Sequence, residues 1–105
     1  MKTPTYVVLA AALAVISYCS AGEMKACSDT NMNGFCDSQI SFGSRQGNWR
    51  SYNWRASINM CVKICKNCLE LGWRCQDYSN NDLSFNKLVV FDWANGEGPH
   101  STSCC

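Results

Sequence analysis

Tryptophan and arginine side chains recur over a short stretch of the chain, in a pattern that suits contact with an anionic surface. Trp49-Arg50 and Trp54-Arg55 repeat at a spacing of five residues. An indole has an apolar body and a polar edge, which suits a membrane interface, and a guanidinium pairs well with phosphate. We predict a membrane or target contact surface made of Arg45, Trp49, Arg50, Tyr52, Trp54 and Arg55. The alternative is that the rings are core and only the arginine heads reach solvent.

The distribution of charge along the chain also indicates this stretch as the contact surface. The whole sequence has a formal charge of +1, and from Glu23 onward eight bases balance eight acids. Residues 44–75 hold six bases and one acid, a charge of +5, so the rest of that part carries −5. A balanced chain does not suit nucleic acid, whose binding rests on many neutralised phosphates. The partner that we expect is an anionic membrane surface, or a membrane receptor or channel.

A loop near the start of the domain has part of a calcium-binding pattern. Five residues match positions 1, 3, 5, 6 and 9 of an EF-hand-type loop: Asp29, Asn31, Asn33, Gly34 and Asp37. The twelfth position is Ile40, where a bidentate Glu is needed. The same residues form an Asx-rich turn equally well. The sequence leaves calcium open at this loop, and we predict no resident metal or cofactor.

The cysteines indicate an oxidising compartment. The chain has nine Cys, and setting aside Cys19, which lies in the leading segment discussed below, leaves eight: Cys27, Cys36, Cys61, Cys65, Cys68, Cys75, Cys104 and Cys105. An even number in a short exported chain is typical of disulfides, here four. Each bridge adds about 2–4 kcal/mol to a domain whose core is marginal.

Two further inferences concern these cysteines. The sequence does not fix the pairing, but adjacent Cys104 and Cys105 should have different partners, because bridging neighbours strains the peptide between them. Four thiolates from residues 61 to 75 would suit zinc in principle, and an oxidising compartment disfavours it.

Few residues suit catalysis. His100 is the only His and lies in a stretch rich in Gly and Pro. No nucleophile elbow, phosphate-binding loop or metalloprotease motif is present in the sequence. We therefore predict that the protein is not an enzyme.

The segment that precedes these residues reads as an export signal. Lys2 is followed by a ten-residue apolar run from Val7 to Ile16, which is too short to cross a bilayer. Small residues then allow cleavage after Ala21 or after Gly22. We predict a signal peptide over residues 1–22, one disulfide-rich domain over residues 23–105, and a secreted, extracellular monomer.

The elements expected within the domain are one helix and a short sheet. Ser57 is a good N-cap and Gly72 a good residue to follow a helix, so the pattern predicts a helix over residues 57–72. Residues 83–93 are rich in Val, Phe and Leu and predict a strand. Asn-Gly pairs at 33–34 and 95–96 predict turns. The expected fold is a small α+β disulfide-rich domain, with one amphipathic helix cross-linked to a short antiparallel sheet.

The cysteine spacing resembles that of two known families. Cys61-x3-Cys65-x2-Cys68-x6-Cys75, preceded by Trp54-Arg55, is similar to the centre of the macins, secreted antimicrobial proteins, and most to their theromacin branch. This resemblance implies a cysteine-bearing helix cross-linked to strands, and antimicrobial activity. Ser57-x3-Cys61-x3-Cys65, followed by Cys75-x2-Tyr78-x-Asn80, resembles apple/PAN modules, which implies binding of protein or sugar.

Three functions follow from these observations. The first is host defence, in which the Trp and Arg residues act on anionic microbial envelopes. The second is a secreted venom toxin that blocks an ion channel or receptor, and the third is an apple/PAN-like binding module. The balanced charge of residues 23–105 counts against the first and not against the other two.

Overall fold

The domain is built almost entirely of β-strands. The computed structural model describes residues 22–105, so the predicted signal peptide lies outside it except for Gly22. The strands are β1 (Glu23–Cys27), β2 (Cys36–Gln39), β3 (Gly43–Trp49), β4 (Ser51–Arg55), β5 (Met60–Lys66), β6 (Leu69–Arg74), β7 (Tyr78–Asn80) and β8 (Phe85–Asp92). Two single 3-10 turns complete the chain: η1 (Thr30–Met32) and η2 (Trp93–Asn95).

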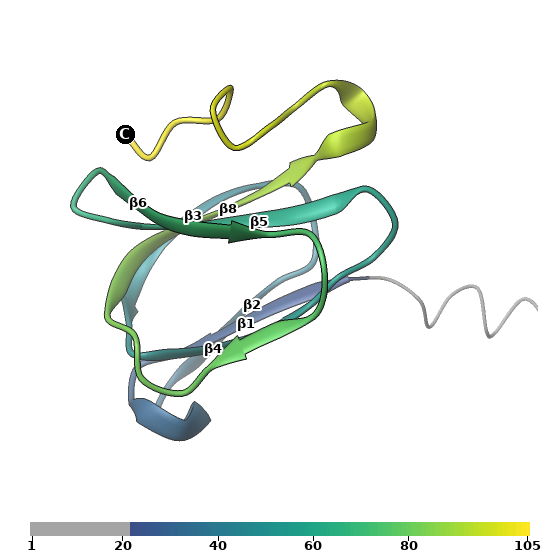
Figure 1. Ribbon diagram of the computed structural model, residues 1–105. Coiled ribbons are helices and arrows are strands. Elements are labelled where there is room, and N and C mark those ends of the chain that lie inside the picture. Colours follow the sequence, from purple (N-terminus) through teal and green to yellow (C-terminus); the bar gives the residue numbers. More distant parts are fainter. Residues whose placement is uncertain (1–21) are drawn as a thin grey trace, which may run out of the picture.

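The strands form two four-stranded antiparallel sheets that face each other (Figure 1). Sheet A has the order β2-β1-β4-β7, and sheet B has the order β3-β8-β5-β6. The first half of the chain places β1 between β2 and β4, and the second half places β5 between β6 and β8 in the same way, so the two halves repeat one arrangement. The third strand of each half, β3 or β7, pairs in the sheet of the other half.

The core lies between the two sheets and is aromatic. Sheet A contributes Met24, Ala26, Tyr52 and Trp54, and sheet B contributes Trp49, Val62, Ile64, Phe85, Leu88 and Val90. The ring centroids of Trp49 and Phe85 lie 5.2 Å apart, and those of Tyr52 and Phe85 lie 5.5 Å apart. These contacts join the two halves of the chain through their largest side chains.

The predicted helix over residues 57–72 is wrong, and with it the α+β fold class. The segment forms β5 and β6, which pair as a hairpin, and residues 22–105 contain no α-helix. Gly72 lies within β6 with a φ of 155° rather than ending a helix. The strand expected over residues 83–93 is confirmed as β8, and Gly34 and Gly96 have the positive φ of the predicted turns.

The reason for the error lies in the spacing of the cysteines. Cys61 and Cys65 are four residues apart, which places them on one side of a helix and equally on one side of a strand. Every residue from Met60 to Cys65 is buried, because both faces of β5 are covered. Asn67 and Cys68 form the hairpin turn, both with positive φ, as a two-residue turn between antiparallel strands requires.

All eight cysteines from Cys27 onward are bridged. The pairs are Cys27–Cys36, Cys61–Cys75, Cys65–Cys104 and Cys68–Cys105. Four disulfides are therefore confirmed, and so is the expectation that the neighbours Cys104 and Cys105 have different partners. The last two bridges both tie the end of the described chain to the β5–β6 hairpin.

The outer face of sheet B is covered by the segment after η2, residues 96–105, which we call the covering segment. It crosses above β5 and β8 in Figure 1. The side chains that point to this face include Lys63, Val89 and Phe91, which are all buried. Lys63 Nζ donates hydrogen bonds to the carbonyl oxygens of Pro99 and Thr102. The covering segment therefore closes a second, smaller buried layer on top of sheet B.

Candidate functional site

The aromatic rings of the predicted contact surface lie inside the protein. Trp49, Tyr52 and Trp54 are 2%, 3% and 0% exposed, and all three belong to the core between the sheets. Trp49 ends β3 in sheet B, and Trp54 lies on β4 in sheet A. The chain passes from sheet B to sheet A between these two residues, and each ring points from its own sheet into the core.

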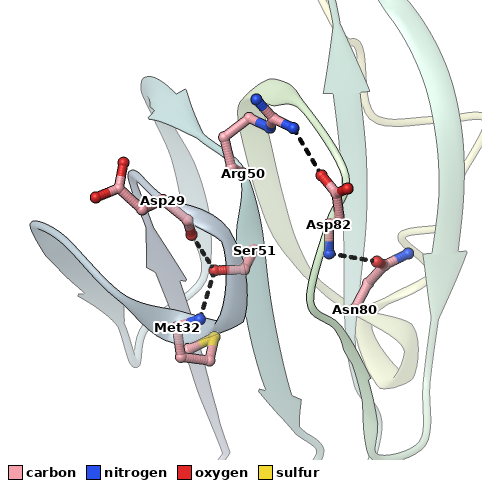
Figure 2. A network of polar contacts seen from close by, with 6 residues as sticks. All are labelled: Asp29, Met32, Arg50, Ser51, Asn80 and Asp82. Atoms are coloured by element: carbon pink, nitrogen blue, oxygen red, sulfur yellow. Dashed lines mark hydrogen bonds and ion pairs between the residues drawn. The ribbon is translucent and has the colours of Figure 1, made fainter.

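The arginines of that stretch remain on the outside. Arg45, Arg50 and Arg55 are exposed. Arg50 lies 2.7 Å from Asp82 (Figure 2). Arg45 lies 3.5 Å from Asp37, so two of the three cations already have a carboxylate partner. The expected surface of mixed Trp and Arg side chains is therefore corrected to core rings and separate surface arginines.

The loop at which the sequence leaves calcium open is held by hydrogen bonds to Ser51 on β4. The hydroxyl of buried Ser51 donates to the carbonyl oxygen of Asp29 and accepts from the amide of Met32 (Figure 2). The Asp37 carboxylate lies on β2, where it accepts a hydrogen bond from Trp49 Nε1 at 2.9 Å. Within residues 22–105 there is no group of three or more His, Cys, Asp or Glu side chains that could hold a metal ion. The Asp29 carbonyl oxygen and the Asp37 carboxylate are thus both hydrogen-bonded to side chains of neighbouring strands.

Large apolar side chains instead gather on the exposed surface at one end of the sandwich. Four connections meet there: β2–β3, β4–β5, β6–β7 and β8–η2, at the same end as residue 22 (Figure 1). They carry, or adjoin, five exposed side chains that we call the loop-end surface: Ile40, Phe42, Ile58, Trp73 and Trp93. Ile58, at the tip of the β4–β5 connection, is 88% exposed. Loops on a rigid β-scaffold are the usual carriers of recognition.

The two indoles of the loop-end surface support each other. Trp73 on β6 and Trp93 in η2 stack with their centroids 5.9 Å apart and an angle of 20° between the planes. They remain 38% and 49% exposed. A second large apolar group on this end, Ile58, borders a hollow of about 680 Å³ formed with residues 75–77. The stacked pair of indoles is thus already in place before a partner binds, which lowers the entropy lost on binding.

The charge of this end is acidic. The segments that build it contain four carboxylates, Glu23, Asp77, Asp92 and Glu97, and two arginines, Arg55 and Arg74. Four negative charges against two positive charges leave the end at −2. An anionic lipid surface would be repelled from such an end, whereas a protein surface need not be.

Sequence reasoning missed this surface because its residues were assigned to other roles. Leu69, Leu71 and Trp73 alternate along β6 with Glu70 and Arg74, which is a strand pattern hidden within the predicted helix. The predicted strand ends at Trp93, whereas in the structure Trp93 begins the η2 turn. The β-turn at residues 67–68 would have indicated that residues 69–74 form a strand, in which side chains alternate between the two faces.

Comparison of the chain with models of protein families, with curated proteins and with solved structures gave no match. In the part of the chain that the structure describes, no helix is long and apolar enough to cross a membrane.

Proposed function

We propose that this protein is a secreted, non-enzymatic recognition protein that binds a protein partner through its loop-end surface. The observation that carries the proposal is the gathering of Ile58, Trp73 and Trp93 on one end of a domain whose other tryptophans are buried. Four disulfides and the signal-like leading segment support an extracellular site of action. Binding of a protein partner is compatible with both alternatives to host defence, the toxin that blocks a channel or receptor and the apple/PAN-like binding module.

The composition of the surface favours a protein partner. Tryptophan is enriched at the centres of protein interfaces, and large apolar groups that stay exposed mark binding surfaces. The acidic charge of the same end and the burial of Trp49 and Trp54 count against action on anionic envelopes. The antimicrobial function therefore has less support than the partner-binding function.

The test is binding of the fluorescently labelled protein to intact cells and to lipid vesicles. The double variant Ile58→Ser, Trp93→Ser should lose at least tenfold in cell binding, because two exposed anchors are truncated. Treatment of the cells with protease should abolish binding, and vesicles of anionic or zwitterionic lipid should bind neither the wild type nor the variant.

A matched control comes from the opposite end of the molecule. Phe35 is 90% exposed in the loop after η1, close to the 88% of Ile58, so Phe35→Ser removes a similar exposed apolar group elsewhere. This variant should bind cells as the wild type does. Equal losses for both ends, or binding that survives protease and is reproduced by anionic vesicles, would contradict the proposal and restore the envelope mechanism.

A further inference from the structure

The sandwich has two lateral openings, where edge strands of the two sheets face each other. One opening lies between β2 and β3, and the other lies between β6 and β7. The repeat of the two halves relates them, because β2 corresponds to β6 and β3 corresponds to β7. The side chains at the two openings can therefore be compared as equivalents.

The opening between β2 and β3 is closed by a carboxylate. Asp37 on β2 lies opposite core residue Ala26, and Arg45 on β3 lies opposite core residue Leu88, so both point between the sheets. The Asp37 carboxylate approaches Arg45 at 3.5 Å and accepts from Trp49 Nε1 at 2.9 Å. A cation, an indole N–H and a carboxylate thus satisfy one another at this opening.

At the opening between β6 and β7 the cation forms no ion pair within residues 22–105. Arg74 on β6 lies opposite core residue Val62, and Tyr78 on β7 lies opposite Trp54, so both also point between the sheets. The Arg74 guanidinium carbon lies 4.0 Å from the centroid of the Tyr78 ring. Within residues 22–105 Arg74 takes part in neither of the ion pairs, which are Arg45–Asp37 and Arg50–Asp82.

A cleft of about 180 Å³ leads inward from this guanidinium. Ile64, Leu71 and Leu83 form an apolar part of its wall, and the rest of the wall is polar, with Tyr52, Tyr78, Asn80 and Arg74. An apolar cavity of about 150 Å³ is large enough for a benzene ring. Burial raises the pKa of Tyr52, with Tyr78 adding to the rise and Arg74 opposing it, so the phenol keeps its proton at neutral pH and remains a donor.

We propose that the cleft between β6 and β7 binds a small organic carboxylate with an apolar body, whose carboxylate meets Arg74 as Asp37 meets Arg45 at the equivalent opening. The guanidinium supplies a flat, charged donor pair for the carboxylate. The aliphatic wall takes the ring or chain. This site borders the loop-end surface, whose charge includes Arg74, but its ligand does not depend on the proposed partner.

The probes are benzoate and hexanoate, which present the same carboxylate on an aryl and on an alkyl body. Each is titrated into the folded, isotope-labelled protein, and NMR shifts are followed at Arg74, Tyr78 and Leu83. At least one acid should bind in the cleft, and the neutral amide of the same shape should bind at least fivefold more weakly, because it lacks the charge. The better of the two acids identifies the body that the cleft prefers.

Arginine variants separate the cleft from general charge effects. Arg74→Gln should weaken binding at least fivefold, whereas Arg55→Gln, at another exposed arginine, should leave it unchanged. If Arg74→Gln does not fold, Arg74→Lys keeps the charge, loses the flat fork and should bind with intermediate affinity. Equal binding of acid and amide, shifts that map elsewhere, or no shift with either acid would overturn the proposal.

Discussion

Lys63 Nζ donates a hydrogen bond to the carbonyl oxygen of Pro99 at 2.9 Å and a second one to the carbonyl oxygen of Thr102. Lys63 is 2% exposed, so the ammonium is removed from water and is held by the covering segment instead. A buried charge is tolerated only where hydrogen bonds replace its hydration. This side chain therefore connects the centre of β5 to a segment 36 residues further along the chain.

Removing this ammonium should destabilise the protein. Lys63→Met keeps much of the side-chain volume but leaves the carbonyl oxygens of Pro99 and Thr102 without their donor, which we expect to cost about 1–3 kcal/mol in the free energy of unfolding. Lys87→Met is the control, because Lys87 lies on the same face of sheet B with no hydrogen bond of its side chain in the structure. Urea denaturation measures both. Equal losses for the two variants would show that the carbonyl contacts are not the cause.

The same residue predicts how stability depends on pH. Burial lowers the pKa of Lys63 below its ordinary 10.5; Glu70 opposes this and Lys87 adds to it. The unfolded chain then holds the proton more tightly than the folded one, so the free energy of unfolding should rise with pH in the window just below 10.5. Denaturation of the wild type and of Lys63→Met from neutral pH to about pH 10 should show this rise in the wild type alone.

The contributions of the two bridges of the covering segment to the free energy of unfolding should be strongly non-additive. Cys65–Cys104 and Cys68–Cys105 close nearly the same loop, with separations of 39 and 37 residues. Once one is formed, the other restricts the unfolded chain little further. Replacing either pair by serine should therefore cost much less than replacing both, which should cost about 4 kcal/mol. Chemical denaturation of the three variants gives the comparison, and equal, additive losses would contradict the loop-closure argument.

The two buried tryptophans allow the contribution of one hydrogen bond to the free energy of unfolding to be measured. Trp49 Nε1 donates to Asp37, whereas Trp54 Nε1 is buried and has no hydrogen-bond partner among residues 22–105. Replacement by Phe removes the same atoms at both sites, so the difference between the variants reports the hydrogen bond. Trp49→Phe should cost about 1–3 kcal/mol more than Trp54→Phe, because Asp37 then loses its donor. Urea melts of the two variants provide the measurement, and equal losses would rule the contact out as a stabilising one.

Ser51 should control the order of the β1–β2 connection. Its hydroxyl is wholly buried and contacts Asp29 and Met32, as Figure 2 shows. Ser51→Ala removes the hydrogen-bond partner of the Asp29 carbonyl oxygen and of the Met32 amide, which are both partly buried, so we expect a loss of about 0.5–1.5 kcal/mol and faster hydrogen exchange at the amide of Met32. Ser79→Ala, at an exposed position on β7, should change neither. An unchanged exchange rate at Met32 in Ser51→Ala would contradict this role.

The parts of the fold that were predictable are those with a local cause. The turn glycines Gly34 and Gly96, the apolar strand β8 and the bridging of the cysteines each follow from a short stretch of residues. The hairpin of β5 and β6 was not predictable in the same way, because an apolar segment with cysteines at 61 and 65 fits both periods. What decides between them is burial of both faces of β5, and one of those faces is covered by residues 96–105.

The candidate site was harder still to predict. Whether a tryptophan is core or surface depends on which sheet its strand joins, and Trp49 and Trp54 join different sheets with both rings facing inward. Trp73 and Trp93 are 20 residues apart in sequence and meet only because η2 returns over the face of sheet B. That Arg74 forms no ion pair within residues 22–105 is likewise visible only once β6 and β7 are placed as facing edges.

The exchange of third strands between the halves governs how this chain can reach its native state. β3 pairs with β8, so sheet B acquires its full width only when residues 85–92 are available, and β7 must likewise return to β4. Neither half can therefore mature alone, and folding waits on contacts of large sequence separation, which is a slow step. As the chain is synthesised, Cys27–Cys36 and Cys61–Cys75 can oxidise within their own hairpins, whereas Cys65 and Cys68 must stay unpaired until Cys104 and Cys105 have been added.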